Sequence, residues 1–393
     1  MTAPKLRFDG FDSDWTLDSI GAVISNKSKK YDPEKSEIDF PCIELEHLSQ
    51  QTGEILGTVS AKDQKSIKNV FDENSVLFGK LRPYLRKFAK PEFQGVCSSE
   101  IWVLTSKKMQ PNFLFQYVQT DGFSELTQIQ AGSKMPRADW GSISNGEILF
   151  PIFEEQTKIA SFLSAVDEKI NQLTQKHQLL SQYKQGMMQK LFSQQIRFKA
   201  DDGSEFDEWK SIQLKDFLTF TPRPVDKPEI AYHALGVRSH FKGLFNKYDS
   251  EPQKISMDTL YTVEKDDVVV NITFAWEGAM AIAKDEHNQG LVSHRFPTYK
   301  CNESKVNLIF FNYRFIQKDF LSHLQLCSPG GAGRNRVLNK QSFLEISFEK
   351  PCVQEQTKIA NFLSAIDQKI EVTAQQIEQA KQWKKGLLQQ MFV

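Results

Sequence analysis

Basic and aromatic side chains alternate in one short segment of the sequence. Residues 80–90 read KLRPYLRKFAK and hold five basic residues and no acidic one. Lys80, Arg82 and Arg86 are suited to bind phosphate oxygens, and the interleaved Tyr84 is suited to stack on a base or a sugar. This composition predicts contact with a polyanion. The alternative that these residues leave open is an ordinary solvated strand edge or helix face.

Two glycine-containing turns carry further basic residues. Residues 132–137 read GSKMPR and residues 330–336 read GGAGRNR, and each turn lies shortly before a strand-like run. Glycine lets the backbone approach a groove closely, and arginine can donate two hydrogen bonds to a guanine edge. The candidate side chains are Lys134 and Arg137 in the first turn, Arg334 and Arg336 in the second, and Arg295 elsewhere. Trp276 is either a further candidate or a core residue, and ordinary surface loops are the alternative for both turns.

The sequence contains none of the short motifs that carry common catalytic chemistry. It has no GxxxxGK[ST] loop for ATP, no glycine-rich fingerprint for S-adenosylmethionine after a strand, and no HExxH or GxSxG. The Asn-Pro-Pro-Tyr and Asp-Pro-Pro-Tyr tetrapeptides typical of amino-methyltransferases are also missing. The histidines and cysteines show no spacing typical of metal ligands. We therefore expect a chain without catalytic residues, a metal or a cofactor of its own.

Length and charge are those of an ordinary globular protein. The 393 residues suggest two or three domains, and 49 basic residues balance 49 acidic ones. A free-standing nucleic-acid-binding protein is often clearly basic, so a zero net charge counts mildly against tight DNA binding by this chain alone and is compatible with a subunit whose partners supply part of a basic surface. The five scattered cysteines are typical of a reducing compartment, and no apolar run approaches the ~18 residues of a membrane helix. We expect a cytoplasmic protein that is not inserted in a membrane.

A direct repeat at an offset of 200 residues organises the chain. Residues 155–170 read EQTKIASFLSAVDEKI, and residues 355–370 read EQTKIANFLSAIDQKI. When residues 151–192 are compared with residues 351–392, 20 of the 42 positions are identical. The chain is therefore two half-molecules in tandem.

Each copy of the repeat is predicted to form one long helix with an apolar seam. Apolar residues recur at spacings of three and four, which is the pattern of a heptad repeat. The seam holds Ile159, Leu163, Val166 and Ile170 in the first copy and Ile359, Leu363, Ile366 and Ile370 in the second. Polar residues such as Lys184, Thr373 and Lys384 interrupt its far half. About 38 residues at 1.5 Å each would form a rod of about 57 Å.

Three arrangements would cover the seam. The two copies pair within one chain, which is our preferred interpretation, or each helix packs on its own domain, or the helices join two chains in a homodimer. Only a short spacer, residues 193–195, separates the first helix from the second globular segment, so the second helix should start near the end of the first. Intramolecular pairing would then be antiparallel, with the globular segments at opposite ends of the rod about a pseudo-twofold axis.

Two unlike globular segments precede the two helices. They open alike, with LRF at 6–8 followed by Trp15 and IRF at 196–198 followed by Trp209. Strands are predicted at 75–78, 99–104 and 268–272, and helices at 112–120 and 307–326. An α+β fold is the prediction for both segments.

With these features the chain resembles the specificity subunit of type I restriction-modification systems. The resemblance is carried by the two EQTKIAxFLSAxDxKI helices, by LRFDGF at 6–11 with Trp15, and by VLFGKLRPYL at 76–85. WEGAMAI at 276–282 and the glycine-rich turn at 330–336 add to it in the second half. These motifs span essentially the whole chain.

The resemblance implies four parts and a division of labour. Residues 1–150 and 196–350 would be target-recognition domains that each read half of a bipartite, asymmetric sequence in double-stranded DNA. Residues 151–195 and 351–393 would be spacer helices that form an antiparallel coiled coil and dock two modification (methyltransferase) subunits and, in a complete system, two restriction subunits. S-adenosylmethionine, ATP and Mg would belong to those partner subunits, and this chain would be non-catalytic.

Two other classes of function stay open on the residues alone. One is a self-contained nuclease or methyltransferase, against which the missing cofactor motifs argue. The other is a scaffold whose coiled coil joins protein partners and whose domains bind something other than DNA, against which the basic and aromatic segment 80–90 argues. A specificity subunit of a modification-only system is a close variant of the favoured interpretation.

Overall fold

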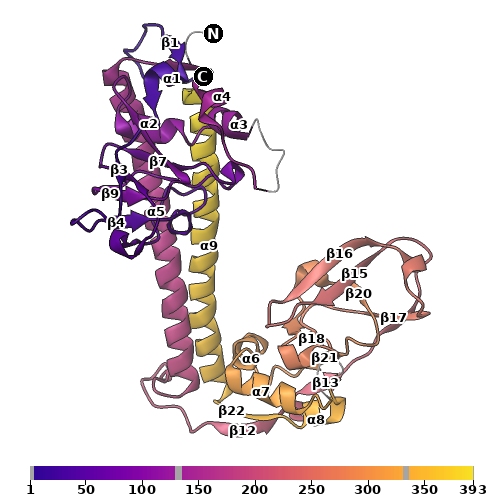
Figure 1. Ribbon diagram of the computed structural model, residues 1–393. Helices are drawn as coiled ribbons and strands as arrows, with labels where there is room; N and C mark the ends of the chain where they lie inside the picture. Colours follow the sequence, from indigo (N-terminus) through magenta and orange to yellow (C-terminus); the bar gives the residue numbers. More distant parts are fainter. Residues whose placement is uncertain (1–3, 129–134, 331–335, 393) are drawn as a thin grey trace. The chain divides into compact units, whose positions relative to one another are not determined.

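The computed structural model describes residues 4–128, 135–330 and 336–392. The chain divides into two compact units. Unit 1 comprises residues 1–177 and 372–393, and unit 2 comprises residues 178–371. Each unit therefore contains one globular part together with a segment of each long helix (Figure 1).

The described part of unit 1 contains three β-sheets. A two-stranded sheet pairs β1 (Thr16–Ser19) with β11 (Glu147–Phe150). A four-stranded sheet has the order β2 (Ile24–Ser25), β10 (Ile101–Ser106), β7 (Val76–Gly79) and β8 (Phe88–Ala89). A five-stranded sheet has the order β3 (Lys30–Tyr31), β6 (Lys68–Phe71), β9 (Gly95–Cys97), β4 (Pro41–Ile43) and β5 (Val59–Ser60). The runs predicted at 75–78 and 99–104 form the adjacent strands β7 and β10.

Unit 2 repeats these sheets strand for strand. Its two-stranded sheet pairs β12 (Lys210–Gln213) with β22 (Ser347–Lys350). Its four-stranded sheet has the order β13 (Leu218–Phe220), β21 (Thr298–Cys301), β18 (Val268–Val270) and β19 (Met280–Ile282). Its five-stranded sheet has the order β14 (Pro224–Asp226), β17 (Thr259–Thr262), β20 (Leu291–Val292), β15 (Tyr232–Val237) and β16 (Leu244–Ser250). Even the parallel pair recurs, as β4 with β9 and β15 with β20. Two unlike sequences thus share one α+β topology.

Short helices cover the sheets at matching points of each unit. In unit 1 they are α1 (Ile20–Val23), α2 (Pro111–Tyr117), α3 (Asp121–Gln128) and α4 (Trp140–Ser144). In unit 2 they are α6 (Leu308–Phe315), α7 (Lys318–Leu326) and α8 (Lys340–Leu344), and a 3₁₀ helix, η4 (Leu214–Asp216), stands where unit 1 has α1. The single helix predicted at 307–326 is thus two helices. The Asn307 side chain caps the start of α6 by accepting the N–H of Phe310, and extended backbone at Gln317 separates it from α7.

The two copies of the repeat form the long helices α5 (Phe153–Phe192) and α9 (Val353–Met391), which pack together antiparallel as predicted. In unit 1, Lys384 Nζ lies 2.6 Å from Asp167 Oδ1. In unit 2, Lys184 Nζ lies 2.6 Å from Asp367 Oδ1. The start of each helix thus meets the end of the other. The two lysines that interrupt the apolar seam are therefore interhelical ion-pair partners.

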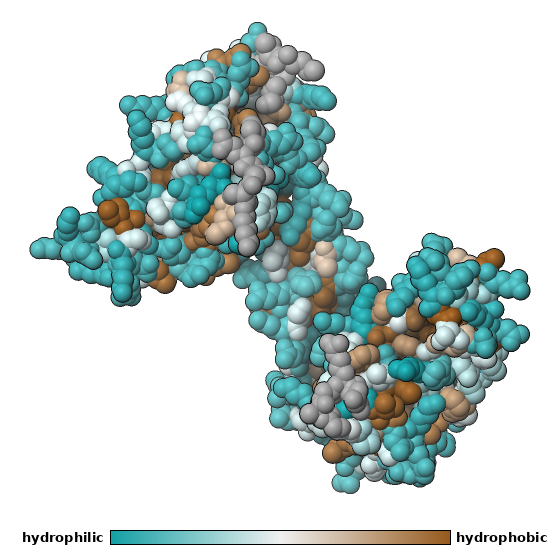
Figure 2. Space-filling model, turned by 45° about the vertical axis from the view of Figure 1, so that its right-hand side comes forward, coloured by the Kyte–Doolittle hydropathy of each residue, from teal (hydrophilic) through white to brown (hydrophobic). Residues whose placement is uncertain are grey.

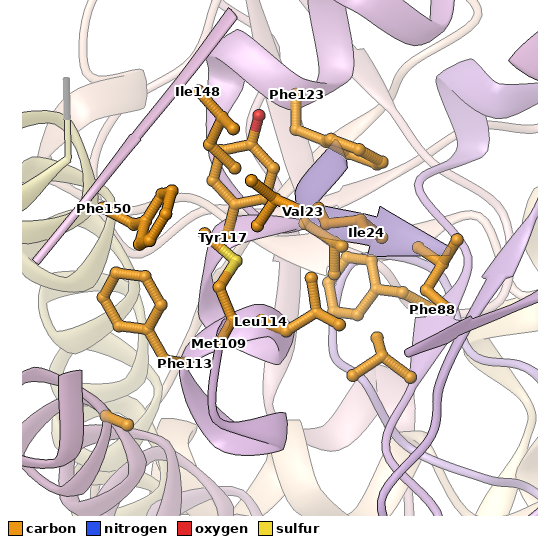
Figure 3. Close-up of a cluster of buried hydrophobic side chains, with 14 of the residues drawn as sticks. Val23, Ile24, Phe88, Met109, Phe113, Leu114, Tyr117, Phe123, Ile148 and Phe150 are labelled. Atoms are coloured by element: carbon orange, nitrogen blue, oxygen red, sulfur yellow. The ribbon is translucent and has the colours of Figure 1, made fainter. Parts of the chain in front are cut away.

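The apolar seam packs against both the other helix and the globular part. In the core of unit 1, shown in part in Figure 3, the buried Leu163 belongs to one cluster with Phe113 of α2 and Met391 of α9. In the core of unit 2, the buried Leu363 belongs to one cluster with Phe310 of α6 and Leu191 of α5. The seam residues buried in this way are Ile159, Leu163, Val166, Ile359, Leu363 and Ile366, with Ile170 and Ile370 partly buried. Burying each such side chain stabilises the fold by about 1.5–3 kcal/mol.

Candidate nucleic-acid interface

The basic and aromatic segment of unit 1 forms the turn of the β7–β8 hairpin. The Gly79 N–H donates to the Lys87 carbonyl at 2.8 Å, which closes the turn around a short 3₁₀ helix, η3 (Pro83–Leu85). Tyr84 at the middle of η3 is 50% exposed, and Arg82 is exposed beside it. The turn therefore presents a cation and an aromatic ring to solvent, as contact with a polyanion requires.

Unit 2 builds the same turn between β18 and β19. The Asn271 N–H donates to the Ala279 carbonyl at 2.9 Å, so the turn closes over the same number of residues as in unit 1 and also holds a 3₁₀ helix, η6 (Ala275–Glu277). Trp276 occupies the position of Tyr84 at the middle of the turn. The Arg336 guanidinium carbon lies 5.3 Å from the centre of the Trp276 ring, a cation–π contact. Trp276 is half-buried, so an aromatic ring and an arginine meet at the surface here as well.

Each hairpin meets two other segments of its unit at one backbone position. In unit 1 the Lys80 N–H donates to the Glu100 carbonyl at 2.9 Å, and the Lys80 carbonyl accepts the Ala138 N–H at 2.9 Å. The Arg82 N–H also donates to the Pro136 carbonyl at 2.8 Å. The segment 80–82 and the residues 136–138, whose sequences suggested two separate basic sites, thus lie side by side.

The corresponding position in unit 2 is Ile272. Its N–H donates to the Arg295 carbonyl at 3.0 Å, and its carbonyl accepts the Leu338 N–H at 2.8 Å. Arg295 and the end of the 330–336 turn are therefore neighbours of the β18–β19 hairpin. We call the backbone meeting points at Lys80 and Ile272 the junctions of units 1 and 2.

The side chains predicted to contact nucleic acid differ in their exposure and in whether they already have a partner within the protein. Lys80 is partly buried, whereas Arg82, Tyr84 and Arg295 are exposed. Arg137 is exposed but pairs with Glu100, with Nε and Oε2 3.0 Å apart. Lys134 and Arg334 lie outside the described residues. Contact between these side chains and nucleic acid stays a prediction.

Arg86 has a partner within unit 1. Its Nη1 donates to Asp121 Oδ1 at 2.8 Å, and its Nη2 donates to the Gln119 carbonyl. The hydrogen bond from Arg86 lowers the pKa of Asp121 below its ordinary value. This guanidinium ties the hairpin turn to α3, and the prediction that it also binds phosphate has less support than that for Arg82.

Glu100, which lies at the junction of unit 1, was not predicted from the sequence as a candidate site residue. Its backbone carbonyl binds Lys80, and its carboxylate orients Arg137. Only the fold brings residues 80, 100 and 137 together, so no local sequence pattern could have identified Glu100.

Unit 2 also has an open hollow of about 510 Å³ that the sequence did not predict. It adjoins the junction and is lined in part by Phe245, Phe274 and Phe296.

Both units expose aromatic residues on the long helices, at equivalent positions of the repeat. Trp383 is 55% exposed, and its ring meets Phe162 edge-on with centroids 6.0 Å apart. Tyr183 is 50% exposed, and its ring meets Phe362 edge-on at 6.5 Å. On the face drawn in Figure 2, hydrophilic residues cover most of the surface, with hydrophobic residues scattered among them. We define the two aromatic patches as Phe8, Phe162 and Trp383 in unit 1 and Phe198, Phe362 and Tyr183 in unit 2.

The described residues hold neither a cluster typical of a metal site nor a helix typical of a membrane span. Across residues 4–128, 135–330 and 336–392, no three His, Cys, Asp or Glu side chains gather in a way that would hold a metal ion. Within those ranges, no helix is long and apolar enough to cross a membrane.

Comparison with known families gives one match that covers most of the chain. The sequence model described as type I restriction modification DNA specificity domain matches twice, at residues 13–181 and 207–382. Each match covers one globular segment and most of the long helix that follows it. The duplication seen in the sequence is thus a duplication of this domain.

Two relatives in Methanocaldococcus jannaschii match over nearly the whole chain. One carries the name of a type I restriction enzyme MjaX specificity subunit and is 27% identical over 376 residues, which cover 90% of this chain and 86% of the relative. The other is the type I restriction enzyme MjaVIII specificity subunit, which is 23% identical over 414 residues, covering 95% of this chain and 91% of the relative. Both matches therefore span most of the length of this chain and of each relative.

Solved structures share the fold. The S subunit of a type I restriction-modification system from M. genitalium superposes with a TM-score of 0.59 at 14% identity, covering 100% of this chain and 99% of that one. The HsdS subunit from Thermoanaerobacter tengcongensis superposes with a TM-score of 0.51 at 16% identity, covering 96% of each chain. At these identities the likeness concerns the fold alone.

Proposed function

The chain belongs to the family of type I restriction modification DNA specificity domains, and from that premise we propose that it selects the DNA site for a methyltransferase complex without catalysing a reaction itself. In this proposal units 1 and 2 each read one half of a bipartite sequence. Because the two units share a topology but differ in their exposed side chains, the two half-sites differ and the target is asymmetric.

The observation that carries the proposal is the equivalence of the two hairpin turns. Turns of equal length place Tyr84 in unit 1 and Trp276 in unit 2 at the same position. Each ring has an arginine nearby: the exposed Arg82 lies two residues before Tyr84 in the same turn, and the Arg336 guanidinium lies over the Trp276 ring. Two domains that bind different DNA sequences in the same way need a common backbone geometry and different exposed side chains. The backbone geometry fixes how each domain docks on DNA, and the side chains determine which bases it recognises.

Docking of two methyltransferase subunits is the second part of the proposal. The aromatic patches recur at equivalent positions of both units, while the surfaces of the globular parts differ. A repeated surface suits two copies of one partner, and exposed aromatic residues are enriched in protein interfaces. S-adenosylmethionine would be bound by those partners, and ATP and Mg by restriction subunits where the system has them.

Each patch can be tested separately. Trp383→Ala and Tyr183→Ala should each weaken one methyltransferase contact, so native mass spectrometry should detect complexes that have lost one partner. Tyr248→Ala is the matched control, because Tyr248 is 65% exposed but belongs to the five-stranded sheet of unit 2. Unchanged two-partner complexes with both variants would refute the docking assignment.

The function itself is tested by mapping methylation. The chain is co-expressed with the methyltransferase subunit of its own system, and the genome is sequenced for N6-methyladenine. A single motif with two unlike halves and a fixed gap is the expected result. No methylation, with the methyltransferase soluble and bound to this chain, would refute site selection and favour a scaffold role.

The spacing between half-sites gives an independent test of the helices as a ruler. Inserting or deleting residues at 193–195, between the first helix and unit 2's strands, should change the length of the gap and leave both half-sites intact. Methylation mapping of such variants checks this. Altered half-sites with an unchanged gap would contradict the ruler.

A further inference from the structure

The junctions of the two units share their backbone hydrogen bonds but not their charges. The carbonyl that accepts the junction N–H belongs to Glu100 in unit 1 and to Arg295 in unit 2. On the other side, the residue before Ala138 is Arg137, whereas the residue before Leu338 is Val337. Of these two flanking positions, one in each unit is therefore an arginine, Arg137 in unit 1 and Arg295 in unit 2, and the two come from different segments.

In unit 1 the arginine is held by a carboxylate. Arg137 Nε lies 3.0 Å from Glu100 Oε2, and Arg137 Nη2 lies 3.5 Å from Glu100 Oε1. These contacts engage one edge of the planar guanidinium and leave the N–H groups of Nη1 for another acceptor. Half of the Arg137 side chain is exposed, at 52%, so that second acceptor can come from outside the protein.

In unit 2 the arginine faces solvent without a carboxylate. Arg295 is exposed on the connection between β20 and β21, and among the described residues its guanidinium has no acidic side chain within salt-bridge distance. Its backbone N–H is fixed by Ser293 Oγ at 3.3 Å. Trp276 and Arg336 lie on the segments that share this junction. Two arginines, Arg295 and Arg336, therefore lie on segments that meet at this junction.

From this arrangement we infer that Arg137 and Arg295 are specificity-determining residues that each read a guanine, one in each half-site. A guanidinium donates two hydrogen bonds to the O6 and N7 acceptors of guanine in the major groove, and no other base offers that pair of acceptors. Glu100 is a positioning residue that fixes the orientation of Arg137. The inference rests on the proposed function and adds the chemistry of one base pair in each half-site.

Base reading is distinguished from phosphate binding by a panel of DNA duplexes. The chain, in complex with its methyltransferase subunits, is titrated with duplexes that carry each of the four base pairs at every position of the mapped motif. Arg295→Ala should lower affinity on the order of 10- to 100-fold for duplexes with the cognate guanine at one position of the unit 2 half-site. Duplexes already mismatched at that position should bind nearly as they do to the unaltered chain. Arg137→Ala should do the same in the other half-site.

Two further variants complete the test. Glu100→Gln should weaken the preference for guanine at the same motif position as Arg137→Ala. The factor should be smaller, because the Arg137 guanidinium remains but is less well oriented. Lys35→Ala and Lys254→Ala are matched controls in units 1 and 2, since both side chains are mostly exposed and each pairs with an acidic residue three positions away and not with a junction residue. They should leave base preference unchanged.

The possible outcomes separate this inference from the proposed function. A uniform loss of affinity across the whole panel would show that the arginine binds phosphate, and would overturn the inference while the bipartite target stands. An unchanged panel would overturn it equally. A chain that yields no bipartite motif before any substitution would instead refute the proposed function.

Discussion

Two internal ion pairs, one in each unit, permit a quantitative prediction about stability. The Arg7 guanidinium donates from Nε and Nη2 to Glu155 at 2.8 and 2.7 Å, and the Glu155 side chain is completely buried. Arg197 makes the equivalent pair with the completely buried Glu355, at 3.1 and 2.7 Å. The bond to Glu155 raises the pKa of Arg7, and the bond to Glu355 raises that of Arg197. Each pair ties the irregular segment that opens a globular part to the first turn of the long helix that follows that part.

Arg7→Ala should destabilise unit 1 by about 3 kcal/mol. Removing one partner of a buried ion pair costs about 3–5 kcal/mol, because the other charge stays buried without compensation. The lower end applies here, since 15% of the Arg7 side chain is exposed and water can enter the vacated space. At 1.4 kcal/mol for each factor of ten, amides near Glu155 that exchange by opening this region should exchange about 100-fold faster.

Hydrogen–deuterium exchange followed by mass spectrometry can resolve this effect by unit. Arg7→Ala should accelerate peptides from 153–166 and spare peptides from 353–366, and Arg197→Ala should do the reverse. The double variant Arg7→Met/Glu155→Gln should recover most of the protection, because an uncharged pair of similar volume is tolerated in a buried site. Less than threefold acceleration by Arg7→Ala, or no recovery in the double variant, would refute the reasoning.

Three further predictions concern single side chains. Burial lowers the pKa of His287, whose Nδ1 accepts the Lys284 N–H, so the unfolded chain takes up a proton before the folded chain as pH falls. The stability that the neutral ring contributes above pH 6.5 therefore decreases as the pH falls below that value, and His287→Gln should reduce the difference between unfolding curves recorded at pH 7.5 and 5.5. A Cβ on Gly236 would lie 2.4 Å from the Phe245 ring, so Gly236→Ala should destabilise unit 2 by about 1–3 kcal/mol, measured by thermal unfolding. Arg82→Ala should weaken binding to all DNA sequences alike and lower the slope of log affinity against log salt by about 0.9, measured by titration at several salt concentrations.

The long helices were predictable because their determinants are local and occur twice. Apolar residues at helical spacing fix the buried face of each helix, and the repeat supplies a second copy as a check. The identical Glu-Gln pairs at 155–156 and 355–356 gain a physical reason only from the fold. Gln156 accepts the Gln110 N–H at 2.8 Å and Gln356 accepts the Asn307 N–H at 2.8 Å, so each glutamine fastens the helix to the segment before α2 or α6.

The candidate interface could be predicted only in pieces. A sequence shows that residues 80–90 and 132–137 are basic, but not that backbone hydrogen bonds join Lys80 to Ala138. It also cannot show that Tyr84 and Trp276 are equivalent, because the equivalence depends on equal hairpin lengths and not on shared residues. The break between α6 and α7 was missed for a similar reason, since the apolar pattern continues through both helices and only the capping geometry separates them.

The two hairpin turns show how one geometry is reached with different chemistry. Both turns end on a residue in the left-handed region, which is Gly278 in unit 2 and Arg86 in unit 1, with φ of 77° and 48°. Glycine adopts this conformation freely, whereas a residue with a side chain pays about 1–2 kcal/mol. The bonds from the Arg86 guanidinium to Asp121 and to the Gln119 carbonyl offset that cost. Arg86 is therefore better explained as a support for the turn than as a reader of DNA. Because the less exposed residues Arg86 and Gly278 hold the shape of the two turns, the surface residues can differ between the units without loss of the fold. Those surface residues include Tyr84, Trp276 and their basic neighbours.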